Sequence, residues 1–433
     1  SAGSLGVIAQ GNIFNQGTLS TASPTGNLSL QALTGSFSNI GTVASAGSLG
    51  VIAQGDISNL GSISTANPAG VLSLQSLTGS LTNQGSIAAG GDLSLVAQLD
   101  LTNAPGAAIT AAGNAVLAAR TGSIINEATT VTTNISRQGV TGMLTGTRTT
   151  VVGAPTLNVG GSLSLNAGED IRLRAVEVNA GGNIVASAGR DIIVGALASS
   201  EEVSRSGRPI ADRLYQGTTE GTRTVTQVGS ALNAGGGVSI NAGRDVSVTA
   251  SAVNARYNIV VGAGRDVSLN AAANTTTSIL DTKKRDTVNS SVTHQGSALN
   301  ADGSIQIVAG DDLTISGSDV NADENVVLAA NGDTRIEGVQ DETYDYEYTR
   351  KKKSFGRKKT TTMEEHAVTN VGSSITAGNN LSVNALVNDE GGISLVDSGN
   401  VAISGSDLSA GNQLVVSAGE VLTLDAGSES YES

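Results

Sequence analysis

The sequence contains no cysteine and no tryptophan, and only 5 of its 433 residues are proline. Without cysteine, neither disulfides nor thiolate metal sites can form. Aromatic residues make up 2% of the chain, far below what a globular core of this length normally uses. No run of about 18 apolar residues occurs, so the sequence predicts no transmembrane segment. These absences argue against a disulfide-stapled domain, a conventional globular core and a membrane span.

Positive charge is also scarce: the sequence contains 24 Lys and Arg residues but 38 Asp and Glu residues, which gives a net charge of −14. Binding to nucleic acid needs clustered cations against the phosphates, so nucleic acid is not expected as a general partner. What the chain does have is glycine, 56 residues, and an apolar fraction of 39% built almost wholly from Val, Ile, Leu and Ala. Such side chains suit a narrow interior lined by strands.

The chain repeats itself with a period of about 20 residues. The segment Ser4–Gly11 recurs unchanged at Ser48–Gly55. Within that unit an Asn-x-Gly pattern returns in steps of 24 and 20 residues, and Asn103 continues it without the closing glycine. The second half keeps the period through paired aspartates 21 residues apart. The asparagines are Asn15, Asn39, Asn59 and Asn83, and the aspartates are Asp170 with Asp191, Asp245 with Asp266, and Asp312 with Asp333.

The period alone would also fit leucine-rich repeats, so the local pattern decides. Apolar residues alternate with polar ones, as in Leu28-Ser29-Leu30 and Val246-Ser247-Val248, which is a strand pattern and not a helical one. Gly, Asn and Asp supply turns every few residues. Three short strands and three turns fill one coil, which predicts a right-handed parallel β-helix of some 16 coils, roughly 75–80 Å long. Stacked asparagines would then form an amide ladder.

Four segments exceed the coil length and differ in composition, being rich in Thr, Arg, Lys and Glu. Three of them return to the coils through the similar phrases Val228-Gly229-Ser230, Gln295-Gly296-Ser297 and Val371-Gly372-Ser373. The sequence therefore predicts plain coils over 1–125, coils with looped-out arms over 126–371, and C-terminal coils over 372–433. The arms are expected near 126–152, 198–228, 273–295 and 338–371.

The fourth arm carries the candidate contact surface. Tyrosines alternate with acidic residues in a strand pattern, a basic run follows, and Thr360–Thr362 suits a return strand after a turn near Gly356. A β-hairpin with a cationic tip would favour an anionic partner such as lipopolysaccharide phosphates, or would be a solvated loop that prevents edge-to-edge aggregation. The candidate residues are Tyr344, Tyr346, Tyr348, Arg350, Lys351, Lys352, Lys353, Arg357, Lys358 and Lys359.

Catalytic, cofactor and metal sites are not expected. The aspartates recur once per coil, as turn formers do, and Arg190, Arg244 and Arg265 beside them would relieve repulsion between stacked carboxylates. His294 and His366 are the only histidines and lie in separate arms, which disfavours a catalytic triad or a zinc site. Parallel β-helices also serve as carbohydrate-active enzymes, but these need carboxylates that converge in one cleft.

The Asn-x-Gly coils of 1–125 resemble the first repeat region of filamentous haemagglutinin-like exoproteins. The Ala-Gly-Arg-Asp coils, the Gly-Ser-Ala-Leu-Asn-Ala returns and the Lys-Lys-Lys-Ser-Phe-Gly arm resemble their second repeat region, typical of contact-dependent growth inhibition proteins. This resemblance implies two-partner secretion through an outer-membrane β-barrel transporter. It also implies display on a Gram-negative cell surface, contact with a target cell's surface or outer membrane, and a part in delivering a C-terminal toxin. We interpret the chain as an internal fragment, with a β-helical enzyme or a host-cell adhesin domain as alternatives.

Overall fold

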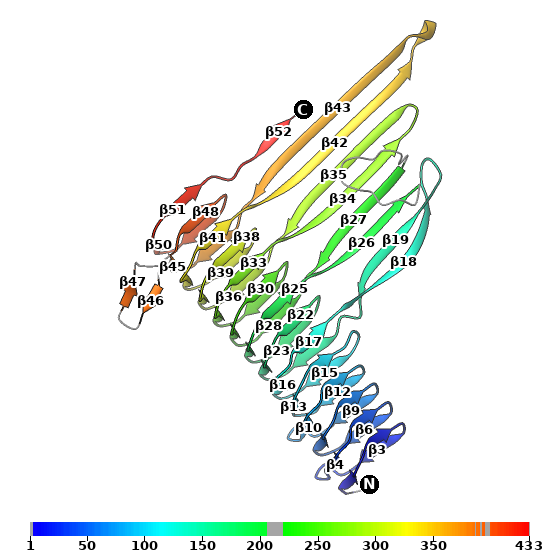
Figure 1. The fold of residues 1–433 in the computed structure, drawn as a ribbon, viewed down its shortest axis with the longest axis vertical. Coiled ribbons are helices and arrows are strands. Elements are labelled where there is room, and N and C mark those ends of the chain that lie inside the picture. Colours follow the sequence, from blue (N-terminus) through cyan, green and yellow to red (C-terminus); the bar gives the residue numbers. More distant parts are fainter. Residues whose placement is uncertain (1–2, 206–219, 386, 390–391, 395–398, 433) are drawn as a thin grey trace.

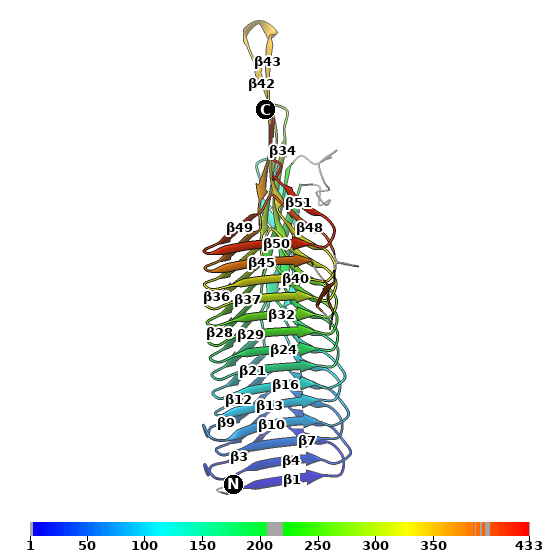
Figure 2. The same cartoon turned by 90° about the vertical axis from the view of Figure 1, so that its left-hand side faces the viewer.

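The computed structural model describes residues 3–205, 220–385, 387–389, 392–394 and 399–432. Most of these residues lie in short strands joined by turns, and the one helical element among them is a short 3₁₀ turn, η1 (Ser354–Gly356). Figure 1 shows a rod of stacked coils from which long hairpins project to one side, and Figure 2 shows the coils as regular steps along the rod. The predicted all-β, parallel β-helix with projecting hairpins is confirmed.

Each coil but the last contributes one strand to each of three parallel sheets, which contain 14, 14 and 13 strands. The first sheet comprises β1 (Leu5–Ala9), β4 (Leu28–Ala32), β7 (Leu49–Ala53), β10 (Val71–Ser76), β13 (Asp92–Ala97), β16 (Ala115–Ala119), β21 (Leu163–Ala167), β24 (Ile184–Ala188), β29 (Val238–Ala242), β32 (Ile259–Ala263), β37 (Ile305–Ala309), β40 (Val326–Ala330), β45 (Asn380–Ala385) and β50 (Gln413–Ala418). The second sheet comprises β2 (Ile13–Asn15), β5 (Phe37–Asn39), β8 (Ile57–Asn59), β11 (Leu81–Asn83), β14 (Leu101–Asn103), β17 (Ile124–Glu127), β22 (Ile171–Arg174), β25 (Ile192–Gly195), β30 (Val246–Thr249), β33 (Val267–Asn270), β38 (Leu313–Ser316), β41 (Thr334–Glu337), β48 (Val401–Ser404) and β51 (Leu422–Asp425). The third comprises β3 (Thr18–Thr21), β6 (Thr42–Ser45), β9 (Ser62–Thr65), β12 (Ser86–Ala89), β15 (Ala108–Ala111), β20 (Thr156–Val159), β23 (Glu177–Ala180), β28 (Ala231–Ala234), β31 (Ala252–Ala255), β36 (Ala298–Ala301), β39 (Asp319–Ala322), β44 (Ser374–Ala377) and β49 (Asp407–Ala410).

The core of the rod follows from the two-residue alternation of its strands. In β10, Leu72 and Leu74 are fully buried, and the register places Leu72 beside Leu49 in one neighbouring coil and Leu93 in the other. Equivalent positions therefore stack on one another along the whole rod, filling a dry interior with Leu, Ile, Val and Ala. Each coil pairs only with the coils before and after it, so the rod is held together by contacts between neighbouring coils.

The expectation of about 16 coils is too high, since the longest sheets hold 14 strands. The chain leaves the coils more often than the composition indicated. A fifth hairpin, β46 (Val387–Asp389) with β47 (Gly392–Ser394), interrupts one C-terminal coil, and β52 (Ser430–Glu432) departs from the rod after β51. These excursions use residues that the sequence reading had assigned to coils.

The four long hairpins are not separate arms. They are β18 (Thr129–Gln138) with β19 (Met143–Val152), β26 (Leu197–Ser204) with β27 (Glu220–Val228), β34 (Ala272–Asp281) with β35 (Arg285–Gln295), and β42 (Val339–Lys352) with β43 (Lys358–Val371). Each hairpin also pairs antiparallel with the next one, and β52 pairs with β43. The result is one nine-stranded antiparallel sheet, here called the arm sheet, which Figure 2 shows edge-on as a single layer.

The spacing of the hairpins along the rod explains why they merge. Each of the four long hairpins leaves between a strand of the second sheet and a strand of the third, so all four project from the same corner, and two coils separate each long hairpin from the next. Two coils rise about 9.6 Å, and the two strands of a hairpin occupy about 9.6 Å of a sheet, because strands are spaced by about 4.8 Å in both cases. The rod therefore places each hairpin directly beside the preceding one, at the distance at which the two can pair as neighbours in the arm sheet.

Candidate functional site on the arm sheet

Tyr344 and Tyr346 lie on one face of the arm sheet. The register places Tyr344 opposite Ser290 and Tyr346 opposite Val288 on β35. It continues from Ser290 to Thr277 on β34 and from Thr277 to Arg223 on β27. Because side chains of directly paired residues point to the same face, aromatic, hydroxyl and apolar groups from three hairpins gather there.

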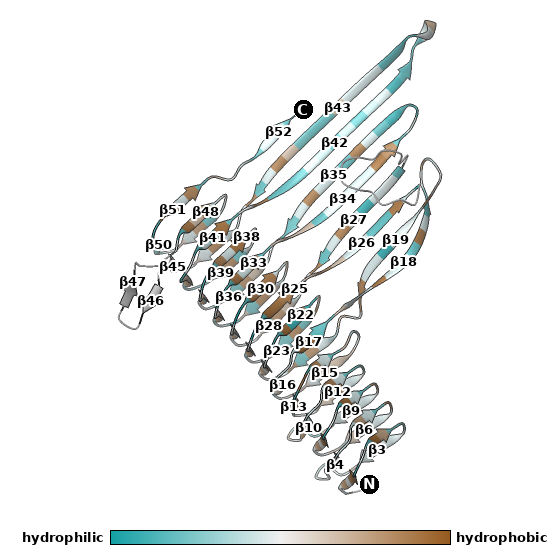
Figure 3. Cartoon of the chain, in the orientation of Figure 1, coloured by the Kyte–Doolittle hydropathy of each residue, from teal (hydrophilic) through white to brown (hydrophobic). Residues whose placement is uncertain are grey.

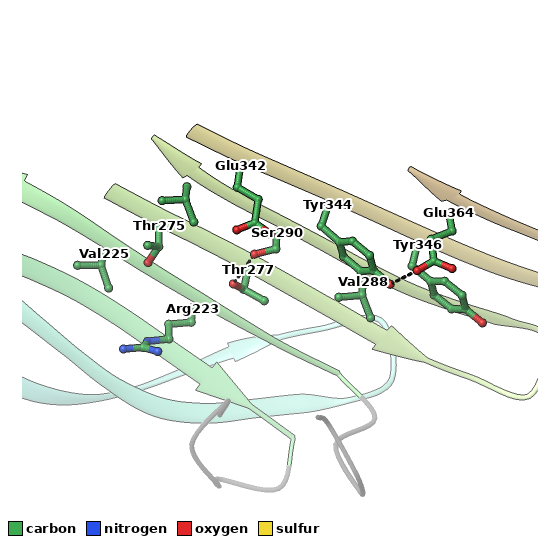
Figure 4. Close-up of a pocket in the computed structure, with 11 residues that line it drawn as sticks. Arg223, Val225, Thr275, Thr277, Val288, Ser290, Glu342, Tyr344, Tyr346 and Glu364 are labelled. Carbon is green, nitrogen blue, oxygen red and sulfur yellow. Dashed lines mark hydrogen bonds between the residues drawn. The ribbon is translucent and has the colours of Figure 1, made fainter. Parts of the chain in front are cut away.

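These side chains line a groove of about 830 Å³ that runs across the strands, here called the tyrosine groove (Figure 4). Valine side chains and threonine methyl groups supply an apolar floor, while Tyr344 and Tyr346 stand at the β42 side. The lining residues are Arg223, Val225, Thr275, Thr277, Val288, Ser290, Val292, Glu342, Tyr344, Tyr346 and Glu364. An apolar floor with a few polar groups around it is typical of binding surfaces.

Hydrogen bonds hold the aromatic side of the tyrosine groove. The hydroxyl of Tyr344 donates to Oε1 of Glu364 at 3.0 Å, as the dashed line in Figure 4 shows. Nε2 of His366 lies 2.9 Å from Oε1 of Glu342, and the Tyr344 ring meets the His366 ring edge-on at 6.2 Å. Two carboxylates, Glu342 and Glu364, thus share one groove. Sequence reasoning missed both, and it had set His366 aside because it considered each arm alone.

The opposite face of the arm sheet joins the hairpins through charges. Glu201 on β26 accepts from Arg148 on β19 at 2.7 Å and from Arg137 on β18 at 3.2 Å, so three strands meet at one carboxylate. Arg285 and Glu347 pair at 3.1 Å between the third and fourth hairpins. Ion pairs of this kind are exposed and individually weak, but here they act beside continuous backbone pairing.

Glu220 joins the first two hairpins near their outer ends. Its carboxylate accepts the backbone N–H groups of Val140 at 2.7 Å and Thr141 at 2.6 Å, together with the Thr141 hydroxyl at 2.8 Å. Burial raises the pKa of Glu220, but these hydrogen bonds outweigh it and hold the pKa below its ordinary value. The turn of the first hairpin is therefore tied to β27.

The outermost part of the fourth hairpin is a dense cluster of cations, here called the cationic tip: the half-buried Arg350 and the exposed Lys351, Lys352, Lys353, Arg357, Lys358 and Lys359. The register places Lys351 directly opposite Lys359 and Lys352 directly opposite Lys358. Within the described part of the chain, no ion pair to an acidic residue is found for these seven side chains. The predicted return strand after a turn at Gly356 is confirmed. Figure 3 shows hydrophilic strands leading to a hydrophobic turn.

The structure separates the predicted contact residues into two places. Tyr344 and Tyr346 line the tyrosine groove, Arg350 to Lys359 form the cationic tip, and Tyr348 lies between them on β42. The third hairpin adds to the tip, since the backbone N–H of Arg350 donates to the Lys284 carbonyl at 2.8 Å and Lys283 and Lys284 are exposed. The basic run of the third hairpin would have revealed this neighbour, had the hairpins been expected to pair.

The periodic aspartates of the rod have the role expected for them. Nε of Arg244 donates to Asp191 in the preceding coil at 2.8 Å, and Arg265 donates in the same way to Asp245. The hydrogen bond from Arg244 lowers the pKa of Asp191, although burial acts in the opposite direction. Among the residues that the structure describes, no group of three or more His, Asp or Glu side chains is arranged to hold a metal ion. In the same residues no helix is long and apolar enough to cross a membrane.

A rod of stacked coils with a projecting sheet defines a repeat protein that displays surfaces along its length. The chain belongs to the hemagglutinin repeat family, whose model matches residues 145–208, 215–288, 280–355 and 353–433. Each match runs from one hairpin to the next or into the C-terminal strands, so the family's repeat corresponds to coils together with an arm. This is a structural, adhesin-type family typical of secreted and cell-surface proteins. No curated protein matches the chain, and no solved structure does.

Proposed function

We propose that the chain is the interaction-bearing stalk of a secreted filamentous exoprotein, and that the arm sheet is the surface with which it contacts a neighbouring cell. The observation that carries this proposal is the cationic tip, whose like charges oppose one another across the hairpin and have no acidic partner among the residues that the structure describes. Opposed like charges destabilise a hairpin in water and are relieved by an anionic surface. Tyr344, Tyr346 and Tyr348 would widen that contact along β42.

The finer assignment is to a contact-dependent growth inhibition exoprotein of a Gram-negative bacterium, in which the stalk helps to deliver a toxin. Secretion would use an outer-membrane β-barrel transporter as partner. Two features of the chain suit passage through such a pore. There is no cysteine to lock the chain beforehand, and coil-on-coil contacts let the rod fold progressively as it emerges.

The test is binding of the whole chain to intact Gram-negative bacteria. In the test variant, residues 350–360 are replaced by Asn-Gly, which joins Thr349 to Thr361, a directly opposed pair, by a favoured two-residue turn. Binding should fall at least tenfold, and added salt should weaken the binding of the unmodified chain. The control variant Arg120→Ser/Arg256→Ser removes exposed cations from the rod and should bind normally. Undiminished binding by the tip variant would reject the proposal.

A second candidate, a carbohydrate-active enzyme, is favoured by one observation: Glu342 and Glu364 line the same groove. Two carboxylates are the minimum that glycoside hydrolysis requires. Release of reducing ends from a panel of bacterial polysaccharides, abolished in Glu342→Gln/Glu364→Gln, would replace the stalk proposal with an enzyme. A third reading, a host-cell adhesin domain, predicts that the chain prefers animal cells to bacteria in the same binding assay.

A further inference from the structure

We propose that the fourth hairpin inserts the Phe355 ring into the acyl-chain boundary of an anionic phospholipid bilayer while the surrounding cations bind lipid phosphates. This inference rests on the proposed function, in which the same tip contacts a cell surface, and it specifies the occupant of that contact. The tyrosine groove is not part of it.

Phe355 lies at the outermost turn of the molecule and is fully exposed. Its backbone adopts φ 63° and ψ 34°, the left-handed region that bulky residues rarely occupy, and Gly356 follows with φ 72°. Asparagine or glycine would make this turn at lower cost. Because the ring is fully exposed to solvent, it contributes nothing to the packing of the hairpin itself. A phenylalanine at this strained position therefore points to a contact with something outside the hairpin.

The cations surround the ring from both strands. Lys353 and Arg357 flank the turn, where the Lys353 N–H donates to the Arg357 carbonyl at 2.8 Å, and the two opposed lysine pairs follow behind them. The apolar ring is therefore outermost, and the positive charges follow two to five residues behind it along each strand. A bilayer surface has the same order in depth, with phosphates outside and hydrocarbon beneath. Anionic lipids would also neutralise the repulsion between the opposed lysines.

The arm sheet holds this turn clear of the rest of the molecule. β42 and β43 each contain 14 residues, and pairing with β35 ends where Arg285 lies opposite Thr349. Only the Arg350 N–H still reaches the third hairpin, at the Lys284 carbonyl, and beyond Arg350 the fourth hairpin extends past its neighbour, as Figure 1 shows. A flat surface can therefore meet the tip without meeting the rod. Nucleic acid, the other large polyanion, has no hydrocarbon layer to take an unsupported ring, and the chain's net charge of −14 opposes it.

The absence of tryptophan from the sequence allows a direct test. Phe355→Trp places the chain's single tryptophan at the turn, and Tyr257→Trp, at an exposed rod position, is the matched control. With vesicles of phosphatidylglycerol and phosphatidylcholine, the emission of Phe355→Trp should shift to the blue and be quenched by lipids brominated on their acyl chains. The control should show neither effect, and pure phosphatidylcholine vesicles should give neither with either variant.

Vesicle sedimentation separates the two kinds of contact. Phe355→Ser should weaken binding to the anionic vesicles on the order of tenfold, and this loss should persist at high salt because it reflects lost apolar burial. Neutralising single tip lysines should weaken binding about fivefold each at low salt. Binding without a blue shift or acyl-chain quenching would overturn the insertion and leave the charge contact of the proposed function intact. Equal tip-dependent binding to a DNA duplex would overturn the assignment to lipid.

Discussion

The side-chain amide of Asn83 donates to the amide oxygen of Asn103 at 2.9 Å, one coil further along the rod. Asn83 in turn accepts from Asn59 at 2.8 Å, and the series of hydrogen bonds continues from Asn15 to Asn126. Each of these asparagines is buried, and Asn83 also donates to the carbonyl of Gly85, which closes its own turn. The ladder ends at Asn126, whose amide nitrogen has no partner among the described residues because Leu173 occupies the next coil.

Asn83→Ala should interrupt this ladder and leave the amide oxygen of Asn103 buried without its donor. A buried acceptor that loses its donor costs about 1–3 kcal/mol. The control is Asn254→Ala in a second ladder, which links Asn254 to Asn233 at 2.8 Å on the part-buried outer side of the rod. Water can replace that bond, so the cost should be about 1 kcal/mol or less. The urea concentrations at the unfolding midpoint of the two variants measure these costs. Equal shifts in both variants would show that burial does not determine how much each ladder contributes to the stability of the rod.

Arg244→Met should make the rod less resistant to acid. Because Arg244 lowers the pKa of Asp191, the folded rod gains stability above the ordinary pKa of about 3.8 and loses it as pH falls through the lowered value. Without the guanidinium, the Asp191 carboxylate becomes protonated at higher pH, so acid unfolding should begin at higher pH. Circular dichroism during acid titration measures this onset. Arg120→Met, which removes an exposed arginine for which the described chain shows no ion pair, should leave it unchanged.

Lys351→Glu separates the stability of the cationic tip from its binding. The new carboxylate would face Lys359 and replace a like-charge pair with an attractive one, so the outer hairpin should exchange its amide hydrogens more slowly. Binding to anionic vesicles should fall about 25-fold, since the change removes two charge units at about fivefold each. Lys351→Gln should reduce binding about fivefold and gain less protection. Unchanged vesicle binding in Lys351→Glu would show that the tip charges do not contact the surface.

Local features of the sequence predicted the coils, because every side chain in a coil meets its own equivalent one coil away. The alternation around Leu72 and Leu74, the asparagine ladder and the Arg244–Asp191 pair are all repeats of one short pattern. The tyrosine groove could not be read in this way. Arg223 and Thr277 come from different hairpins and are paired there. Their pairing requires that the rise of two coils equals the width of one hairpin, and no single segment of the sequence encodes that equality.

The equality between the rise of two coils and the width of one hairpin in the arm sheet can be tested with two deletions that join equivalent positions of the repeat. Removing residues 230–296 joins Gly229 to Ser297 and takes out two coils together with one hairpin, leaving the return phrase Val-Gly-Ser-Ala-Leu-Asn-Ala unchanged. β27 would then meet β42 at the normal strand spacing, and the arm sheet should re-form. Removing residues 231–251 joins Ser230 to Ala252 and takes out a single coil.

After the single-coil deletion, the second and third hairpins would leave the rod about 4.8 Å apart, where about 9.6 Å is needed for both to lie in one sheet. The rod should survive, because the new junction restores an ordinary coil with Val253 in place of Leu232. The arm sheet should split between β27 and β34, exposing their backbone amides. In this variant, hydrogen exchange should therefore be fast at those amides of residues 222–225 and 275–278 that point across the split. In the 67-residue deletion, residues 222–225 should exchange slowly throughout. Full protection in both variants would show that the arms bend enough to pair at any spacing, and that the rise of the rod does not build the sheet.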